Sequence, residues 1–140
     1  MRDLRHALPI HLAGRMLGLI LAGCGSEPAA EEPTLTRVQS EVFDASCAFS
    51  SCHGEGGGSG NLSLVDGESY AELVGVAADI DTGVTRVVAG DADASFLVAK
   101  LENTQEPTTQ GDAMPTTGGG LDEDRLQLVR DWIDAGAADD

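Results

Sequence analysis

The sequence predicts an all-α protein, a small helical domain with long loops. Three observations carry this prediction. Apolar residues recur at three- and four-residue spacings in several short segments. No run of residues alternates as a strand should, apart from a weak stretch at 85–89. Between the helical segments lie polar and glycine-rich stretches, and the five glycines within residues 54–60 have too much backbone freedom to join a regular element.

The first helix is predicted from about Thr36 to Ala45. Thr34 is a good N-cap residue, and Leu35, Val38 and Val42 follow at helical spacing. Two short helices are expected in the middle of the chain, one capped by Ser69 and the other beginning at Asp93 or Ser95. Their inward-facing side chains are apolar: Tyr70, Leu73 and Val74 in the first, and Phe96, Leu97 and Leu101 in the second.

The clearest helix is predicted for residues 121–135. Acidic residues at 122–124 favour a helix N-terminus, and Gly136 is a typical C-terminal stop. Leu126, Val129 and Ile133 form its apolar stripe. Before it, residues 102–120 are expected to form a long irregular loop, and loops of that length are usually functional or disordered.

The N-terminus has the pattern of an export signal. Three arginines and one acid precede a short apolar run, Met16 to Ala22, which is too short for a transmembrane helix. The run ends in Leu-Ala-Gly-Cys, which resembles a bacterial lipobox. The resemblance implies a signal peptide at 1–23, acylation of Cys24 and a lipidated tether at 24–35. Because Gly25 follows the cysteine, we expect an outer-membrane anchor that faces the periplasm.

Charge restricts the partners that the exported chain can have. Removing residues 1–23 takes away three arginines and one acid, so the formal net charge of −16 becomes about −18. Such an acidic surface argues against nucleic acid and anionic lipid as direct partners. It suits a basic protein partner, or it serves solubility alone. Few aromatic side chains are present, so an apolar cofactor would help to fill the core.

Four residues supply all the soft or imidazole ligands of the domain after export. His53 and Met114 are the histidine and the methionine that remain, and with Cys24 acylated the remaining thiols are Cys47 and Cys52. Three of the four stand together as Cys-Ala-Phe-Ser-Ser-Cys-His. A c-type haem needs two thiols and a histidine directly after the second, usually as Cys-x-x-Cys-His.

This segment resembles the cytochrome c family, in a variant with four residues between the cysteines. The resemblance spans residues 36–138: a helix before the motif, a glycine-rich loop after it, a late Met114-Pro115 and a final helix ending in Asp-Trp-Ile-Asp-Ala-Gly-Ala. It implies a cytochrome c-like domain with haem c attached to Cys47 and Cys52. By the same resemblance His53 is the proximal ligand of the iron and Met114 the distal one. The implied function is one-electron transfer between redox proteins, not catalysis.

The same residues allow other interpretations. Cys47 and Cys52 can form a disulfide in an exported protein, which would make the domain a haemless binding or structural module. A zinc site lacks a fourth ligand and the usual spacing. The acidic pairs at 79 and 81 and at 91 and 93 fit no EF-hand pattern and are read as turns and helix starts. Arg86 is a weak candidate to pair with a haem propionate.

Overall fold

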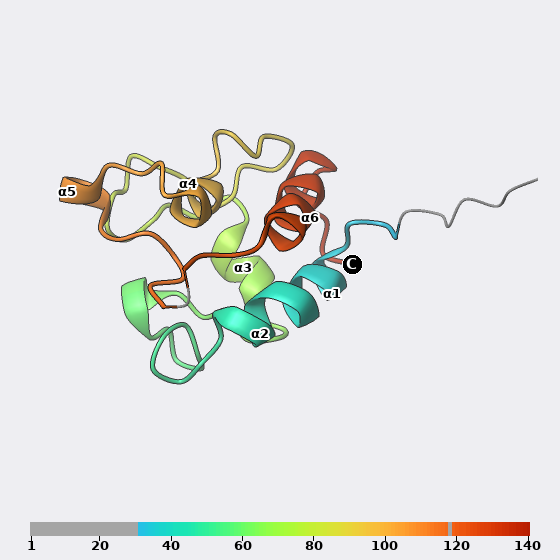
Figure 1. The fold of residues 1–140 in the computed structure, drawn as a ribbon, viewed down its shortest axis with the longest axis horizontal. Coiled ribbons are helices and arrows are strands. Elements are labelled where there is room, and N and C mark those ends of the chain that lie inside the picture. The colour runs from blue at the N-terminus through green and yellow to red at the C-terminus, as the bar shows by residue number, and fades with distance from the viewer. Residues whose placement is uncertain (1–30, 118) are drawn as a thin grey trace, which may run out of the picture. The chain divides into compact units, whose positions relative to one another are not determined.

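The computed structural model describes residues 31–117 and 119–140. Within these residues the protein is mainly helical, and its β-structure is limited to three isolated bridges (Figure 1). The all-α class is therefore confirmed, and the weak strand predicted at 85–89 is reduced to single bridged residues. The helices are α1 (Leu35–Val38), η1 (Gln39–Phe43), α2 (Asp44–Ser46), η2 (Ser59–Asn61), α3 (Ser69–Leu73), α4 (Phe96–Glu102), α5 (Pro107–Gln110) and α6 (Glu123–Asp134).

The first predicted helix is confirmed as one continuous helical stretch made of α1, η1 and α2. Its central part, η1, is wound as a π-helix. Thr34 caps it as expected, since its side chain accepts a hydrogen bond from the Arg37 backbone N–H at 3.3 Å. Leu35, the last residue of the predicted tether, is the first residue of α1 and is buried in the core.

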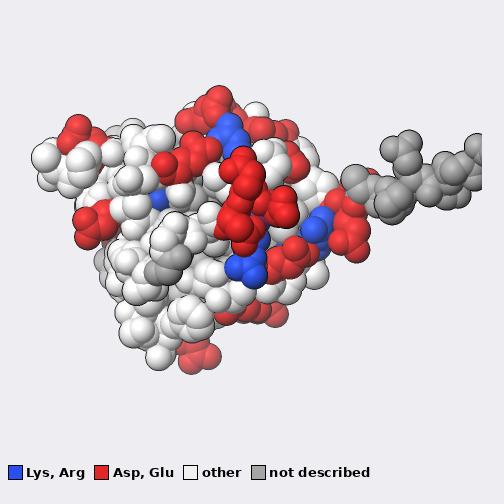
Figure 2. All heavy atoms as spheres, viewed as in Figure 1, with Lys and Arg blue, Asp and Glu red and all other residues white. Residues whose placement is uncertain are grey.

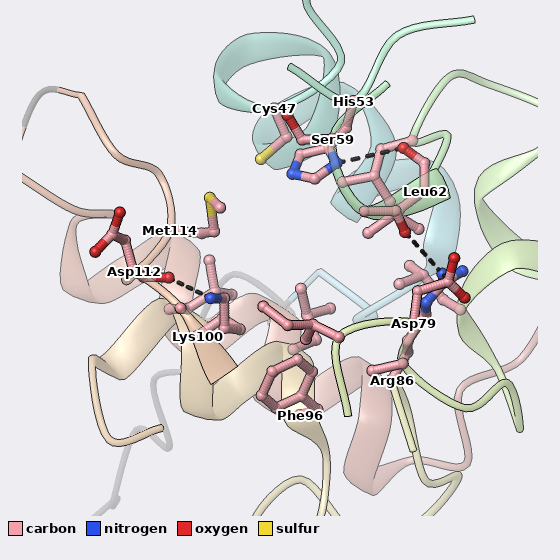
Figure 3. Close-up of a pocket in the computed structure, with 18 residues that line it drawn as sticks. Cys47, His53, Ser59, Leu62, Asp79, Arg86, Phe96, Lys100, Asp112 and Met114 are labelled. Atoms are coloured by element: carbon pink, nitrogen blue, oxygen red, sulfur yellow. Dashed lines mark hydrogen bonds and ion pairs between the residues drawn. The ribbon is translucent and has the colours of Figure 1, made fainter. Parts of the chain in front are cut away.

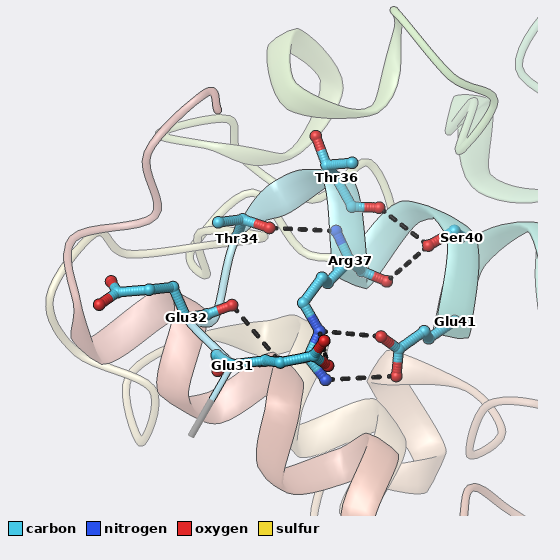
Figure 4. A network of polar contacts seen from close by, with 7 residues as sticks. All are labelled: Glu31, Glu32, Thr34, Thr36, Arg37, Ser40 and Glu41. Carbon is cyan, nitrogen blue, oxygen red and sulfur yellow. Dashed lines mark hydrogen bonds and ion pairs between the residues drawn. The ribbon is translucent and has the colours of Figure 1, made fainter. Parts of the chain in front are cut away.

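Arg37 ties the start of this helix to the chain that precedes it (Figure 4). Its Nε donates to Glu41 Oε1 at 2.9 Å, one turn further along the helix. Its Nη1 donates to the backbone carbonyl of Glu31 at 3.0 Å. Because these groups are largely exposed, the contacts orient the entering chain more than they stabilise it.

Helix α6 was predicted correctly and provides much of the core. Asp122 caps it by accepting a hydrogen bond from the Arg125 backbone N–H at 3.0 Å. Trp132 and Ile133 are almost fully buried, and α6 packs against α1 and α4. The chain then turns back, and the Asp140 backbone carbonyl accepts from the Thr36 N–H at 3.0 Å. The first and last helices are thus joined by packing and by hydrogen bonds.

The two middle helices are confirmed, but their capping differs from the prediction. The Ser69 hydroxyl does not cap α3, because it donates at 2.7 Å to the amide oxygen of Gln39 in the core. Ser95 stands at the N-cap position of α4, yet its hydroxyl donates to the Asp91 carbonyl at 2.8 Å. In both cases a buried hydroxyl bonds a group other than the helix end: a distant side chain for Ser69, and the preceding turn for Ser95.

The loop predicted at 102–120 contains a short helix, α5. Glu106 caps it by accepting from the Thr108 N–H at 3.1 Å, and Pro107 occupies its first turn. The predicted signal peptide and the lipidation site Cys24 lie outside the described residues. Among the helices that are described, none has the length and apolarity to cross a membrane.

Candidate functional site

A cavity of about 280 Å³ lies between the Cys-His segment, the following loop, α4 and the segment before Met114 (Figure 3). Most of the side chains around it are apolar. Three of the four predicted ligand residues line it, namely Cys47, His53 and Met114, together with Leu62, Leu64, Leu73, Ala78, Ile80, Phe96, Leu97 and Leu101. In Figure 3 the two sulfur atoms and the imidazole ring face the same space.

The Cys-His segment closes on itself despite the wide spacing of its cysteines. The His53 N–H donates to the Cys47 carbonyl at 3.2 Å, and inside this ring the Cys52 N–H donates to the Phe49 carbonyl at 2.8 Å. The additional residues bulge outward, leaving Phe49 51% exposed. Cys47 and His53 therefore both reach the cavity although five residues separate them.

Cys52 is the predicted site residue that the structure does not bring to the cavity. It is half-buried, and its sulfur lies 3.7 Å from the Ser51 hydroxyl. A turn packs against its backbone, because the Ser59 N–H donates to the Cys52 carbonyl at 2.7 Å. A Cβ on Gly58 would lie 2.1 Å from this same carbonyl, so the turn requires glycine at 58.

His53 is oriented by the loop that follows it. Its Nδ1 lies 3.3 Å from the backbone carbonyl of Leu62. Because a carbonyl only accepts, this contact places the proton on Nδ1 and leaves the lone pair on Nε2. Burial lowers the pKa of His53 from its usual value, although the hydrogen bonds to the loop oppose the shift. The ring is therefore held neutral, as a metal ligand must be.

Met114 reaches the cavity from a different part of the fold. It is half-buried, and its backbone N–H donates to the Lys100 carbonyl on α4 at 2.8 Å. This bond joins the irregular segment to a regular helix. The sequence predicted Met114 as a site residue, and the structure places it with Cys47 and His53.

Arg86 lines the cavity, but its guanidinium is occupied by protein groups. Nη1 donates to the Glu72 carbonyl at 2.8 Å and to the Glu72 carboxylate at 3.1 Å. Nη2 donates to the carbonyls of Gly60 and Asn61 at 3.1 and 3.3 Å, and Asp79 lies 3.6 Å away. The suggested pairing of Arg86 with a propionate is therefore replaced by a structural role: it holds the loop that orients His53.

Replacing Arg86 with methionine should destabilise the domain by about 3 kcal/mol, because the buried side chain loses four partly buried hydrogen bonds together. Urea denaturation measures this loss. The matched control is Arg125→Met, which removes a cation from a half-exposed position at the start of α6. Equal stability of the two variants would show that the Arg86 contacts contribute nothing beyond charge.

Cys47 and Cys52 are both free thiols in the structure. Burial, and to a smaller extent the neighbouring Cys52, raises the pKa of Cys47 to about 11. Since the thiolate is the reactive form, Cys47 should be unreactive at neutral pH.

In the haem-free chain with Cys24→Ser and Cys52→Ser, we expect alkylation of Cys47 at pH 8 to be about 100-fold slower than in denaturant. The rate should rise with pH, reach half of its maximum at about pH 11, where the thiol is half ionised, and level off above that pH. Alkylation that is quenched at successive times and followed by mass spectrometry measures this rate. Rapid labelling of the folded chain at pH 8 would contradict the buried position of this thiol.

The two segments that carry the predicted haem ligands are uncharged, since no charged residue occurs within residues 47–53 or 113–121. Charged residues do line other parts of the cavity, namely Asp79, Arg86, Lys100 and Asp112. Figure 2 shows acidic side chains gathered near the start of α6, with large uncharged areas elsewhere on the same face. Within the described residues, no three His, Cys, Asp or Glu side chains group to hold a metal ion by themselves.

Comparison with known proteins finds no relative of this chain. No protein-family model matches the chain, no curated protein is significantly similar to it, and no solved structure matches it.

Proposed function

We propose that the domain is a c-type cytochrome, an electron carrier with one covalently attached haem. The observation that supports this best is the convergence of Cys47, His53 and Met114 on one apolar cavity. These residues come from two segments more than sixty positions apart in the chain. A histidine, a thioether and a thiol around an apolar space make a suitable donor set for haem c.

The residues present fit such a group in most respects. The cavity of about 280 Å³ is close to the lower end of the usual range for ligand sites, about 300–1,000 Å³. Neutral His53 has Nε2 free for coordination, and the Met114 sulfur faces the same space. Cys52 has to turn from Ser51 toward the cavity to form its thioether. A propionate would need a partner other than Arg86.

Each side chain then has a defined task. Haem, when bound, would supply an iron for one-electron oxidation and reduction. His53, with its orientation fixed by the Leu62 carbonyl, and the Met114 sulfur would hold this iron, and a thioether favours the reduced state more than a second histidine would. Cys47 and Cys52 would hold the macrocycle covalently. The leucine and phenylalanine walls exclude water, and the domain turns over no substrate.

The partners are proposed to be other redox proteins. The segments at 47–53 and 113–121 give an uncharged surface beside the cavity, while the rest of the chain carries the excess of acid. A basic partner would be attracted by that charge and would make close contact at the uncharged surface.

The carrier is further proposed to be anchored in the outer membrane by lipid on Cys24. Mass spectrometry of the N-terminal peptide of envelope-extracted protein should find Cys24 as the first residue, with acyl chains attached. The matched variant Cys24→Ala should be released from the membrane fraction. An unmodified N-terminus at another residue would contradict the anchor.

Redox titration of the chain produced together with a haem-attachment system tests the electron-carrier function. We expect a reversible one-electron curve and a thioether-type haem spectrum. The competing function is a haemless module closed by a Cys47–Cys52 disulfide. A colourless product with one intact disulfide would favour that module and would contradict the proposal.

A further inference from the structure

Lys100 is the single lysine of the chain, and it lies beside the cavity instead of on the acidic surface. It is carried by α4 and is half-buried. The proposed function assigns it no task. Its surroundings nevertheless include several contacts with the segment that carries Met114.

The Lys100 ammonium is held by two backbone carbonyls, of which Figure 3 draws that of Asp112. Nζ donates to the Gln110 carbonyl at 2.8 Å and also to the Asp112 carbonyl. The ammonium also lies over the Phe96 ring, 5.6 Å from its centre. Both hydrogen bonds are charge-assisted and therefore stronger than those between neutral groups.

Lys100 makes a third contact through its backbone. Its own carbonyl accepts the Met114 N–H at 2.8 Å. One residue of a regular helix thus holds segment 110–114, which begins at the last residue of α5, at three points, and the last of them is the residue with the sulfur. Two other bonds reach the start of this segment: Gln105 Nε2 donates to the Gly111 carbonyl at 3.1 Å, and Gln110 Nε2 donates to Asp81 at 2.8 Å.

The placement of a cation here has an electrostatic cost. Burial lowers the pKa of Lys100, and the nearby Asp112 carboxylate opposes the shift. A half-buried ammonium is tolerated at such a position when hydrogen-bond acceptors replace the water that it loses. The two converging carbonyls are such acceptors.

We propose that Lys100 is a positioning residue that fixes the 110–114 segment against α4 and so holds the Met114 sulfur toward the cavity. The proposal rests on the proposed function for its consequence at the iron. Its structural content, however, concerns the protein chain alone and is measurable without haem.

The experiment compares three variants of the full chain with wild type. Lys100→Met keeps the aliphatic part of the side chain and removes the donors, whereas Lys100→Arg keeps a cation with donors. Arg125→Met removes one positive charge from another surface and controls for net charge. In the haem-free chain, amide hydrogen exchange is followed by NMR at Met114 and, as an internal reference, at His53.

Lys100→Met should accelerate exchange at Met114 by about tenfold or more, the change expected when charge-assisted hydrogen bonds are lost. The His53 amide, bonded to Cys47, should exchange at the wild-type rate, and Lys100→Arg should restore much of the protection at Met114. Unchanged exchange in Lys100→Met would overturn the proposal. If that variant unfolds, Lys100→Ala, which also removes the donors, takes its place, and absence of a selective effect there would also overturn the proposal.

The haem-loaded protein separates this inference from the proposed function. Lys100→Met should weaken the sulfur-to-iron absorption band and bind added imidazole about tenfold more tightly than wild type, with haem still attached. Haem-loaded Lys100→Met with wild-type absorption and imidazole affinity would overturn the positioning role and leave the cytochrome function intact. Selective exchange at Met114 in a chain that never acquires haem would support the positioning role and contradict the cytochrome function.

Discussion

Replacing Met114 with alanine should lower the reduction potential by on the order of 0.1 V or more while the haem remains covalently attached. In the proposed cytochrome the thioether would stabilise the ferrous iron, and without it the sixth position would be open to water or an added ligand. The sulfur-to-iron absorption band should disappear. Spectroelectrochemistry measures the band and the potential in one titration.

Thr116→Ala is the matched control for this variant, because it changes an exposed side chain in the same segment. We expect it to retain the wild-type spectrum and potential. If Met114→Ala also retained both, another group would occupy the sixth position and the assignment of Met114 as distal ligand would be wrong.

Replacing Cys52 with serine should remove most of the covalently bound haem. One of the two thioether bonds is lost, and Cys47 alone is buried and protonated at neutral pH. The fold should survive, since Cys52 is half-buried and does not line the cavity. Haem staining after denaturing electrophoresis, normalised to protein, quantifies the loss.

Ser51→Ala provides the control for Cys52→Ser. It removes the hydroxyl that lies beside the Cys52 sulfur and leaves both cysteines in place. Full haem content in Ser51→Ala and little in Cys52→Ser would assign the effect to the thiol. Equal haem content in Cys52→Ser and wild type would contradict a two-thioether attachment.

Local sequence signals predicted the elements that local physics determines. Helix α6 has an acidic cap at Asp122, a buried stripe that includes Val129, and Gly136 with a φ of +113° at its end. Helix α5 was missed although it had a signal of the same kind, since Glu106 is a capping residue and Pro107 follows it. The helix was missed because that segment has few apolar residues and therefore shows no helical periodicity.

Tertiary contacts account for the features that the sequence did not reveal. Ser69 looked like a cap, but the buried amide of Gln39 thirty residues away binds its hydroxyl. The acceptors of Arg86 lie on two segments before it. Those of Lys100 lie ten and twelve residues after it, at the end of α5 and just beyond that helix. Neither the periodicity of apolar residues nor a sequence motif predicts such pairings.

The candidate site likewise has features that the local sequence predicted and features that depend on the folded structure. Cys47 and His53 were found because their chemistry is local to one heptapeptide, and Met114 because few other ligands exist in the chain. The outward bulge at Phe49, which brings Cys47 and His53 to one cavity, depends on hydrogen bonds that the motif does not specify. The same bulge leaves the Cys52 sulfur next to the Ser51 hydroxyl and outside the cavity lining, a position that the spacing of the cysteines alone could not predict.

The most direct test of the central claim is the mass of the denatured protein. The chain is produced in a cell with a competent haem-attachment system, unfolded in acid and denaturant, and digested. We predict that the peptide containing Cys47, Cys52 and His53 carries the mass of one haem that denaturant does not remove. The same peptide without haem, whether reduced or closed by a disulfide, would contradict the proposed cytochrome.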